Sequence, residues 1–146
     1  MSLHKLGRWF YDDSQADIRD ELTRFGKLNE YIPTQFADAK CLCGSTVFGL
    51  KIDENEGAAV RICVACSKSH PIGDSDEYLE EANLEECACP CGEGKFKVTV
   101  GLHLYDGSED VRWLYLGCRC SVCGITANYA DWKNEFEDYR VLLARV

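Results

Sequence analysis

Closely spaced cysteines are the residues of this 146-residue chain whose types and spacing suggest chemistry. The stretch CACPCG at 87–92 places three of them at every second position, and CRCSVC at 118–123 brings three more together. Thiolates are ligands for borderline and soft metal ions, and four of them complete a tetrahedral Zn²⁺ shell. With six cysteines in the two stretches, the first question is which four bind.

A tandem repeat answers this question. The segment CLCGSTVFGLKI at 41–52 aligns with CPCGEGKFKVTV at 89–100, and CVAC at 63–66 aligns with CSVC at 120–123. The second copy carries nine more residues between its two cysteine pairs, and in both copies an aspartate follows the last cysteine by eight residues. Self-similarity of this extent indicates a duplication within the chain.

Each copy therefore supplies one predicted tetrathiolate site. The first copy contains only four cysteines, so their counterparts are the expected ligands in the second. We predict two structural Zn²⁺ ions, since four thiolates leave no position for water, although iron accepts the same ligands. The glycines that follow Cys43, Cys91 and Cys123 suit tight turns whose backbone N–H groups face the sulfurs. The predicted ligands are Cys41, Cys43, Cys63 and Cys66 at the first site, and Cys89, Cys91, Cys120 and Cys123 at the second.

Two cysteines remain outside these sets. Cys87 and Cys118 align with Ala39 and Arg61 of the first copy. Each precedes a ligand by two residues, and side chains two apart on a strand share a face, so we expect the two thiols to lie close together. Three interpretations stay open: free buried thiols, a disulfide or redox pair, and alternative ligands.

The pattern CxCG, then an alternating hairpin, then CxxC resembles the zinc ribbon, a relative of the rubredoxin-type knuckle. The resemblance covers residues 41–66 and 89–124. It implies hairpins built around structural metal, and no particular activity, because zinc ribbons serve many functions. The first knuckle of each copy departs from the usual pattern with one residue between its cysteines, and Ser67 stands where a glycine follows the other pairs.

The remaining segments predict the elements that position the cysteines. An amphipathic helix is expected over 14–26, capped by Ser14 and ended by Gly26, with Ile18, Leu22 and Phe25 on one face. The stretch WFY at 9–11 is a short strand or an apolar plug.

Two hairpins and two further helices follow in the prediction. The second hairpin runs from Phe96 through a turn at Asp106 and Gly107, with Val111, Trp113 and Tyr115 on one face of its return strand. The first hairpin turns near 53–57. Helices are expected over 74–86 and 131–146, and the latter places a core face at Trp132, Phe136, Tyr139, Leu143 and Val146.

The predicted fold class is therefore α+β: two tandem zinc-ribbon-like units, each followed by a helix, behind an N-terminal helical leader. The expected divisions are 1–40 for the leader, packed on the first unit, 41–86 for the first ribbon with its helix, and 87–146 for the second. No stretch has the apolar length of a signal peptide or of a membrane span, which predicts a cytoplasmic protein.

Charge gives the main indication of a partner. The 25 acidic and 16 basic side chains give a formal net charge of −9, and two filled tetrathiolate sites take it to about −13. Such a charge weakens binding to nucleic acid and favours a basic protein, although it also serves solubility alone. The predicted partner-binding segment, which is otherwise a solvated face, has seven acidic residues and no basic one: Asp74, Asp76, Glu77, Glu80, Glu81, Glu85 and Glu86.

No catalytic motif accompanies these features, so we expect a non-enzymatic zinc protein that binds a basic partner, of the immunity or inhibitor type. One alternative is a nucleic-acid-associated factor that uses Lys95, Lys97, Arg112 and Arg119. The other alternative is a thiol-redox sensor that uses Cys87 and Cys118. His70 follows Cys66 by four residues but is not needed as a ligand.

Overall fold

Strands dominate the structure. The computed structural model describes residues 4–6, 9–11, 18–53, 57–73, 75, 78–80, 82–89, 91–133 and 138–146. The helices of these ranges are α1 (Ile18–Asn29) and α2 (Tyr139–Leu143). The strands are β1 (His4–Leu6), β2 (Trp9–Tyr11), β3 (Gln35–Asp38), β4 (Phe48–Asp53), β5 (Ala58–Cys63), β6 (Ser69–Pro71), β7 (Glu85–Glu86), β8 (Phe96–Leu104), β9 (Val111–Cys120) and β10 (Ile125–Lys133).

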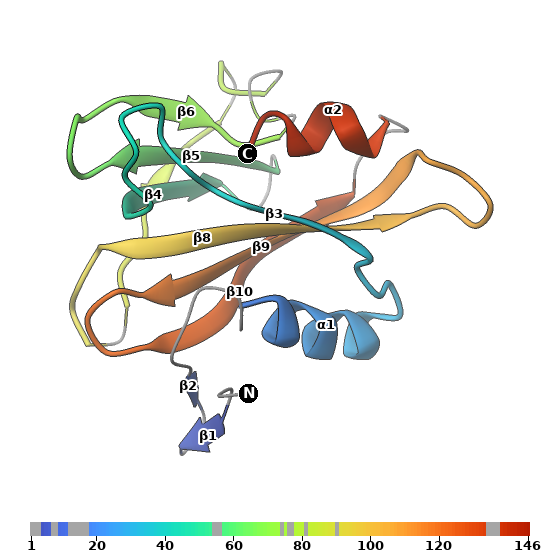
Figure 1. Cartoon of the computed structure of the whole chain (residues 1–146), viewed down its shortest axis with the longest axis horizontal. Coiled ribbons are helices and arrows are strands. Elements are labelled where there is room, and N and C mark those ends of the chain that lie inside the picture. Colours follow the sequence, from blue (N-terminus) through green and yellow to red (C-terminus); the bar gives the residue numbers. More distant parts are fainter. Residues whose placement is uncertain are drawn as a thin grey trace.

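All the described strands join one antiparallel sheet (Figure 1). Its order is β1-β2-β10-β9-β8-β4-β5-β6, with β3 added on β8 and β7 added on β4. The two predicted hairpins are present as β4–β5 and β8–β9, and they meet where β4 pairs with β8. The WFY stretch is strand β2, which pairs with β10.

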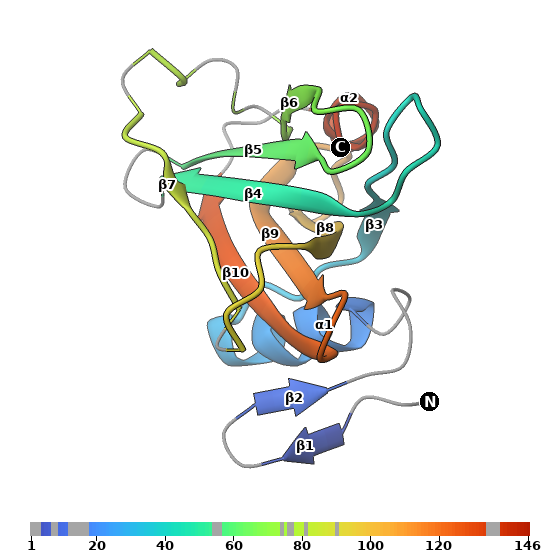
Figure 2. The ribbon, with the colours of Figure 1, turned by 90° about the vertical axis from the view of Figure 1, so that its left-hand side faces the viewer.

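The sheet folds over so that one hairpin covers the other. Figure 2 shows β4 and β5 crossing β9 and β10 at a steep angle. The main core lies on the concave side and contains Phe48 and Leu50 from the first hairpin and Phe96, Val98 and Leu116 from the second. Apolar residues at every second position of β4 and β8 face inward, and β8 is buried on its other face as well at Thr99 and Gly101.

The duplication is also visible in the strand pairing. β6 pairs with β5 in the same register as the start of β10 pairs with β9. His70 lies opposite Arg61, and the equivalent residue Ala127 lies opposite Cys118. Likewise β3 adds to β8 as β7 adds to β4. Each structural repeat is therefore a strand, a knuckle, a hairpin, a second knuckle and a closing strand.

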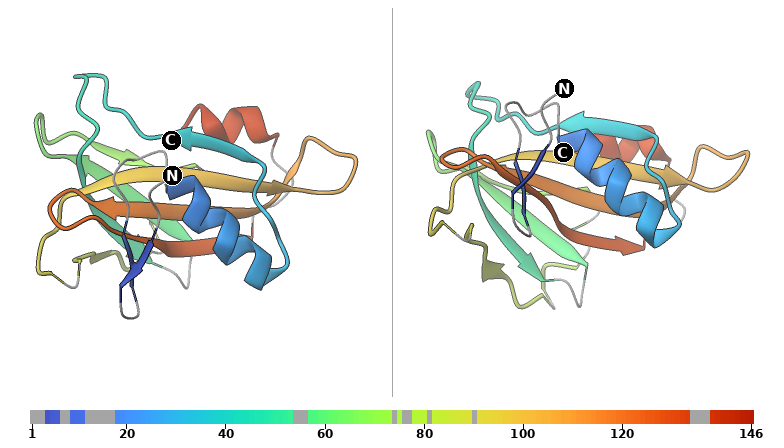
Figure 3. Two further views of the ribbon diagram at one scale, coloured as in Figure 1. Left: turned by 60° about the horizontal axis from the view of Figure 1, so that its bottom comes forward. Right: turned by 90° about the horizontal axis from the view of Figure 1, so that it is seen from below.

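Helix α1 covers the opposite face of the second hairpin (Figure 3). Ile18 and Leu22 form a second small core with Tyr115 of β9, and Phe25 packs against it, as the predicted apolar face required. The prediction that the leader packs on the first unit is wrong for this helix. The close approach depends on Gly117 of β9, where an added Cβ would stand 2.5 Å from Ile18 Cγ2.

The end of α1 also differs from the prediction. The helix continues through Gly26 to Asn29, and Glu30 then adopts a positive φ of 68°. Gly26 instead accommodates the returning chain, because an added Cβ would stand 2.5 Å from Pro33 Cδ. The predicted N-cap, Ser14, lies outside the described residues.

A β-bulge changes the predicted faces of the long hairpin. The register shifts between His103 and Leu104, so Val111 opposes Leu104 whereas Trp113 opposes His103. Val111 therefore joins the main core, while Trp113 turns toward the α1 side and packs there. Sequence alternation alone gives no signal for the extra residue of a bulge.

The helix predicted over 74–86 is not present in the described part of that segment. Residues 78–80 form a turn and β7 pairs with β4 instead. Like charges on neighbouring helical turns repel each other, and pairing with β4 satisfies backbone groups without a helix. Asp74, Asp76, Glu77 and Glu81 lie outside the described residues.

The helix predicted over 131–146 is much shorter. Trp132 and its neighbours continue β10 as far as Lys133, opposite Trp113 of β9. Among the described residues of this segment only α2 is helical, and the Asp138 side chain caps it by accepting a hydrogen bond from the Arg140 backbone N–H. Trp132 and Val146 still belong to the main core, and Tyr139 and Leu143 pack against it. Phe136 lies outside the described residues.

Both hairpins belong to one sheet, and the three-part division of the chain stays a prediction. Neither α1 nor α2, the helices of the described ranges, is long and apolar enough to cross a membrane.

Candidate metal centres

Four cysteines of the first repeat converge at one point. The knuckle before β4 supplies Cys41 and Cys43, and the turn after β5 supplies Cys63 and Cys66. Their Sγ atoms all lie within 4.8 Å of one another. Sγ of Cys41 lies 3.5 Å from that of Cys66, and Sγ of Cys43 lies 3.5 Å from that of Cys63.

The second repeat forms the same arrangement between β8 and β9. The Sγ atoms of its four predicted ligands also lie within 4.8 Å of one another. Sγ of Cys89 lies 3.4 Å from that of Cys123, and Sγ of Cys91 lies 3.7 Å from that of Cys120. In both clusters, each short pair joins a sulfur of the first knuckle to a sulfur of the second knuckle, as a shared ion requires.

These distances fit a tetrahedral metal ion. Zn–S bonds of about 2.3 Å at tetrahedral angles separate neighbouring sulfurs by about 3.8 Å. The shortest separation, 3.4 Å, is far longer than the S–S bond of about 2.05 Å in a disulfide. All ten cysteines are outside disulfides. The donor sets can therefore hold two metal ions, and thiolates alone accept zinc or iron.

The backbone of the knuckles matches the prediction from the glycines. Gly44 and Gly92 have φ values of 98° and 96°, and Gly124 has a φ of 84°. Ser67 takes the equivalent position after the first CxxC and also has a positive φ, 64°. The departure from glycine in the sequence thus leaves the turn intact, at the cost of a left-handed conformation for a residue with a Cβ.

The turns direct backbone N–H groups at the sulfurs. The backbone N–H of Cys66 has the largest effect on the pKa of the Cys63 thiol and lowers it. Burial acts in the opposite direction, but with the further help of the Ala65 N–H the pKa falls to about 6. At the second site, burial raises the pKa of Cys120, but the N–H groups of Cys123 and Val122 outweigh it and the net shift is downward. Hydrogen bonds to the charged form favour the thiolate, the form that binds metal.

A buried arginine distinguishes the first site from the second. The Arg61 guanidinium lies 4.5 Å from the ring centroid of Phe48, and its Nε donates to the Val146 carbonyl at 2.7 Å. Burial lowers the pKa of Arg61, and the charges of Cys41 and Cys63 act in the opposite direction. A filled tetrathiolate site has a formal charge of about −2, so Arg61 offsets part of it.

The equivalent position at the second site holds a neutral thiol. Cys118 is fully buried, and burial raises its pKa well above the usual value, with a further contribution from the charge of Cys87. The sequence alignment paired Arg61 with Cys118 but did not reveal the role of the arginine. The only available signal was a charged residue at an inward-facing strand position.

The surplus cysteines lie near each other, as their spacing predicted. Cys87 is close enough for its charge to act on Cys118, and it packs against the core that contains Cys118. Neither is in a disulfide, and neither joins the two groups of converging sulfurs in the described residues. The backbone N–H of Cys87 donates to the Leu50 carbonyl at 2.9 Å, which anchors the chain before the second knuckle.

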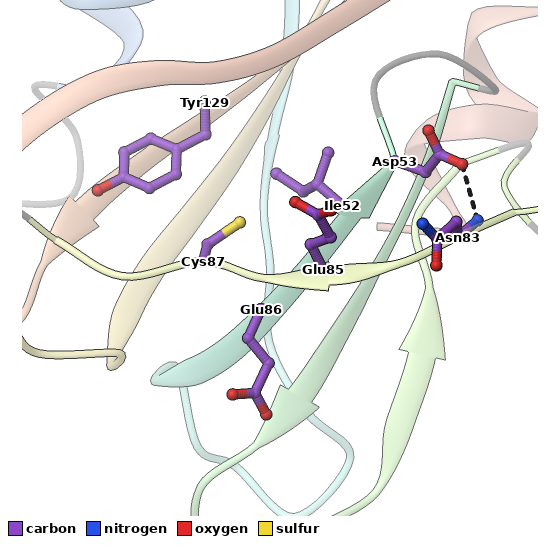
Figure 4. Close-up of a pocket in the computed structure, with 7 residues that line it drawn as sticks. All are labelled: Ile52, Asp53, Asn83, Glu85, Glu86, Cys87 and Tyr129. Carbon is purple, nitrogen blue, oxygen red and sulfur yellow. Dashed lines mark hydrogen bonds between the residues drawn. The ribbon is translucent and has the colours of Figure 1, made fainter.

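The described carboxylates of the acidic segment, residues 74–86, lie at the surface. Glu80, Glu85 and Glu86 are exposed. Glu85 and Glu86 lie on β7, beside a pocket that also reaches Asp53 and Tyr129 (Figure 4). These carboxylates are evident in the sequence, but the pocket is not, because it forms only when β7 adds to β4.

The basic candidates do not form one continuous strip. Lys97 stands opposite Arg119 on the β8–β9 ladder, near the second metal centre. Arg112 lies at the other end of the hairpin, 4.4 Å from the ring centroid of Tyr31. His70 takes no part in the sulfur cluster, and its Nε2 lies 2.6 Å from the Arg145 carbonyl.

No family model matches this chain, and neither does any curated protein or solved structure in the comparisons made. The two tetracysteine clusters are compatible with zinc-ribbon-like sites on the geometry alone.

Proposed function

We propose that the protein is a non-enzymatic zinc-binding protein with two structural tetrathiolate sites, and that its acidic surface binds a basic protein partner. The observation that carries the metal assignment is the convergence of four Sγ atoms within 4.8 Å at each site. Zinc is the preferred ion because it accepts tetrahedral thiolates without redox chemistry.

The chain's own residues fix the metal sites in the fold. Cys41, Cys63, Cys89 and Cys120 are buried at the base of the hairpins, whereas Cys43 and Cys91 are exposed at the knuckle tips. A bound ion would link each pair of knuckles and hold the ends of the hairpins together. Such a link supplies folding free energy that a small core lacks.

Charge supports the second half of the proposal. The chain has a formal net charge of −9, and the stretch from 74 to 94 contains no lysine or arginine. Glu80, Glu85 and Glu86 are exposed in this stretch. Electrostatic complementarity increases association rates and selects a partner of opposite sign. An immunity or inhibitor role, in which the protein covers a cationic surface, suits these features.

Mass spectrometry tests the metal half. The native mass of protein purified without added metal should exceed the denatured mass by two zinc ions, and the denatured chain should carry ten free thiols. Iron would instead give a coloured protein with a thiolate-to-iron absorption band. A chain without metal and with several disulfides would contradict the proposal.

Capture from source lysate tests the partner half. The zinc-loaded protein, immobilised through one terminus, should retain a basic protein with and without nuclease treatment. Material that disappears on nuclease treatment would favour the nucleic-acid alternative. Elution by salt should be steep, since the attraction between exposed charges is screened.

A further inference from the structure

Apart from the metal centres, the described residues form a pocket of about 350 Å³ between β7 and β10. Ile52 and Asp53 line it from β4, Asn83 and Glu85 line it from the acidic segment, and Tyr129 lines it from β10. Cys87 and Glu86 complete the lining. The volume is within the range of about 300–1,000 Å³ that is typical of ligand sites.

The pocket combines an apolar base with acidic walls. Ile52 is buried, and the half-buried Tyr129 ring packs edge-on against Phe96 with centroids 5.1 Å apart. Asp53 Oδ2 accepts a hydrogen bond of 2.8 Å from the Asn83 backbone N–H, which fixes that carboxylate at one end. Figure 4 shows Cys87 and Tyr129 toward the other end, with Glu85 between the ends.

All the charged residues among the described lining residues are acidic. Asp53 and Glu85 contribute two carboxylates, whereas the Glu86 side chain points away from the other lining side chains (Figure 4). No lysine, arginine or histidine is among the described lining residues. A cavity with low-dielectric walls and charges of one sign concentrates counter-ions of the other sign. The pocket is therefore suited to a cation.

We propose that this pocket is the binding site for an arginine side chain of the basic partner, an inference that rests on the proposed function. A planar guanidinium binds carboxylates through paired N–H donors, which matches Asp53 and Glu85. Tyr129 lines the pocket toward its other end, away from Asp53 (Figure 4). The aliphatic stem of the arginine covers Ile52. A lysine ammonium lacks the paired donors, so arginine is the better fit.

Amide chemical shifts of the zinc-loaded full chain test the proposal. The probe is the blocked tripeptide acetyl-Gly-Arg-Gly-amide, and the matched control peptide carries citrulline, which has the same shape without the charge. The arginine peptide should shift the amides of Asn83, Glu85, Cys87 and Tyr129 in a saturable manner. The citrulline peptide should bind at least tenfold more weakly, and the lysine peptide should fall between them.

Two variants with the same change in net charge separate a built site from general attraction. Glu85→Gln removes a lining carboxylate, whereas Glu80→Gln removes an exposed carboxylate of the same segment that does not line the pocket. Glu85→Gln should weaken the arginine peptide at least fivefold and Glu80→Gln less than twofold. Equal losses in the two variants, or equal binding of citrulline, would overturn the proposal.

The same variants distinguish this proposal from the proposed function. If the captured partner binds the Glu85→Gln variant as tightly as the unaltered protein, the pocket does not bind an arginine of that partner, although the protein still binds a basic partner. If the arginine peptide binds in the pocket but no basic protein is captured, the proposed function fails and the cation site remains.

Discussion

Phe48 and Phe96, which occupy the same position in the two repeats, stand directly opposite each other where β4 pairs with β8. A local two-fold axis therefore relates the two halves. The axis also exchanges the lead strands: the Ala39 N–H donates to the Val98 carbonyl, and the equivalent Cys87 N–H donates to the Leu50 carbonyl, both at 2.9 Å. The strand that leads into each metal site is thus held by the hairpin of the other site.

This exchange predicts that the two sites fill cooperatively. Order at the first site fixes β4, which anchors β7 and the second knuckle, so the first ion should favour the second. Typical coupling free energies are about 1–3 kcal/mol. Native mass spectrometry of metal-free protein at one equivalent of zinc should then show less of the one-zinc species than independent, equal sites would produce.

A ligand variant provides the complementary test. Cys43→Ser removes an exposed ligand of the first site and should also weaken zinc retention at the second site about tenfold against a chelator, a factor in the range of ordinary coupling. Leu42→Ala is the control, because that side chain is 97% exposed and adjoins the same ligand. Unchanged retention at the second site would show that the sites are independent.

Sequence predicted the ligand sets and the hairpins because both depend on local spacing. The repeat identified the eight converging sulfurs, and alternation identified β4, β5, β8 and β9. In the described residues, the helix predicted over 74–86 is absent and the helix predicted over 131–146 is reduced to α2, both for a tertiary reason. Trp132 continues a strand because β9 offers it a partner, and Glu85 pairs with Ile52 of β4. Neither partner is visible from local periodicity.

The position of α1 could not be predicted from the sequence either. Ile18 and Leu22 can pack this closely only where the facing strand has a residue without a side chain, and Gly117 is that residue. The pocket beside Glu85 was missed for a similar reason, since its wall is formed by Tyr129 of a distant strand.

Acid should release zinc from the second site before the first. The pKa of Cys63 is lowered to about 6, so its thiolate stabilises the folded site above the usual cysteine pKa, and that contribution is lost only as the pH falls through about 6. Burial raises the pKa of Cys89 at the second site, which disfavours its thiolate. Cys43 opposes the trend: the Ser45 backbone N–H lowers its pKa, but hydrogen bonds with Cys63 and Cys41, together with burial, outweigh that effect and raise the pKa to about 11.

Cysteine ¹³Cβ shifts, which distinguish metal-bound from free thiols, would follow each site separately from pH 7 to pH 4. The resonances of Cys89 and Cys120 should change at a higher pH than those of Cys41 and Cys63. Release from the first site at the higher pH would contradict the prediction.

Removing the buried arginine should reverse this order. Arg61→Leu deletes the cation beside Cys41 while keeping an apolar side chain at an inward position. Hydrogen bonds to charged groups contribute about 1.5–3 kcal/mol, so zinc at the first site should be held at least tenfold more weakly. The same ¹³Cβ measurement under chelator competition reads out the order of loss. Arg61→Lys, which retains the charge, should be intermediate, and an unchanged order in Arg61→Leu would rule out charge compensation.

Gly117→Ala should destabilise the protein by displacing α1. The added Cβ would stand 2.5 Å from Ile18 Cγ2 and 2.9 Å from Leu22 Cδ2, both in a packed core. Overpacking of this kind costs about 1–3 kcal/mol. Gly49→Ala is the matched control, since the nearest atoms to its added Cβ are 3.8 Å away. Thermal melts in excess zinc should show a lower Tm for Gly117→Ala alone, and equal melting of the two variants would contradict the packing argument.

The surplus thiols should be dispensable for metal binding. The first repeat has Ala39 and Arg61 at their positions and still brings four sulfurs together. The double variant Cys87→Ala and Cys118→Ala should therefore keep two zinc ions by native mass. It should lose about 1–2 kcal/mol of stability, because Cys118 is fully buried and a smaller side chain leaves a cavity. Loss of one zinc ion would make these cysteines ligands. If the unaltered protein changes its zinc content on mild oxidation and the double variant does not, the redox interpretation is favoured; an identical response in both would exclude it.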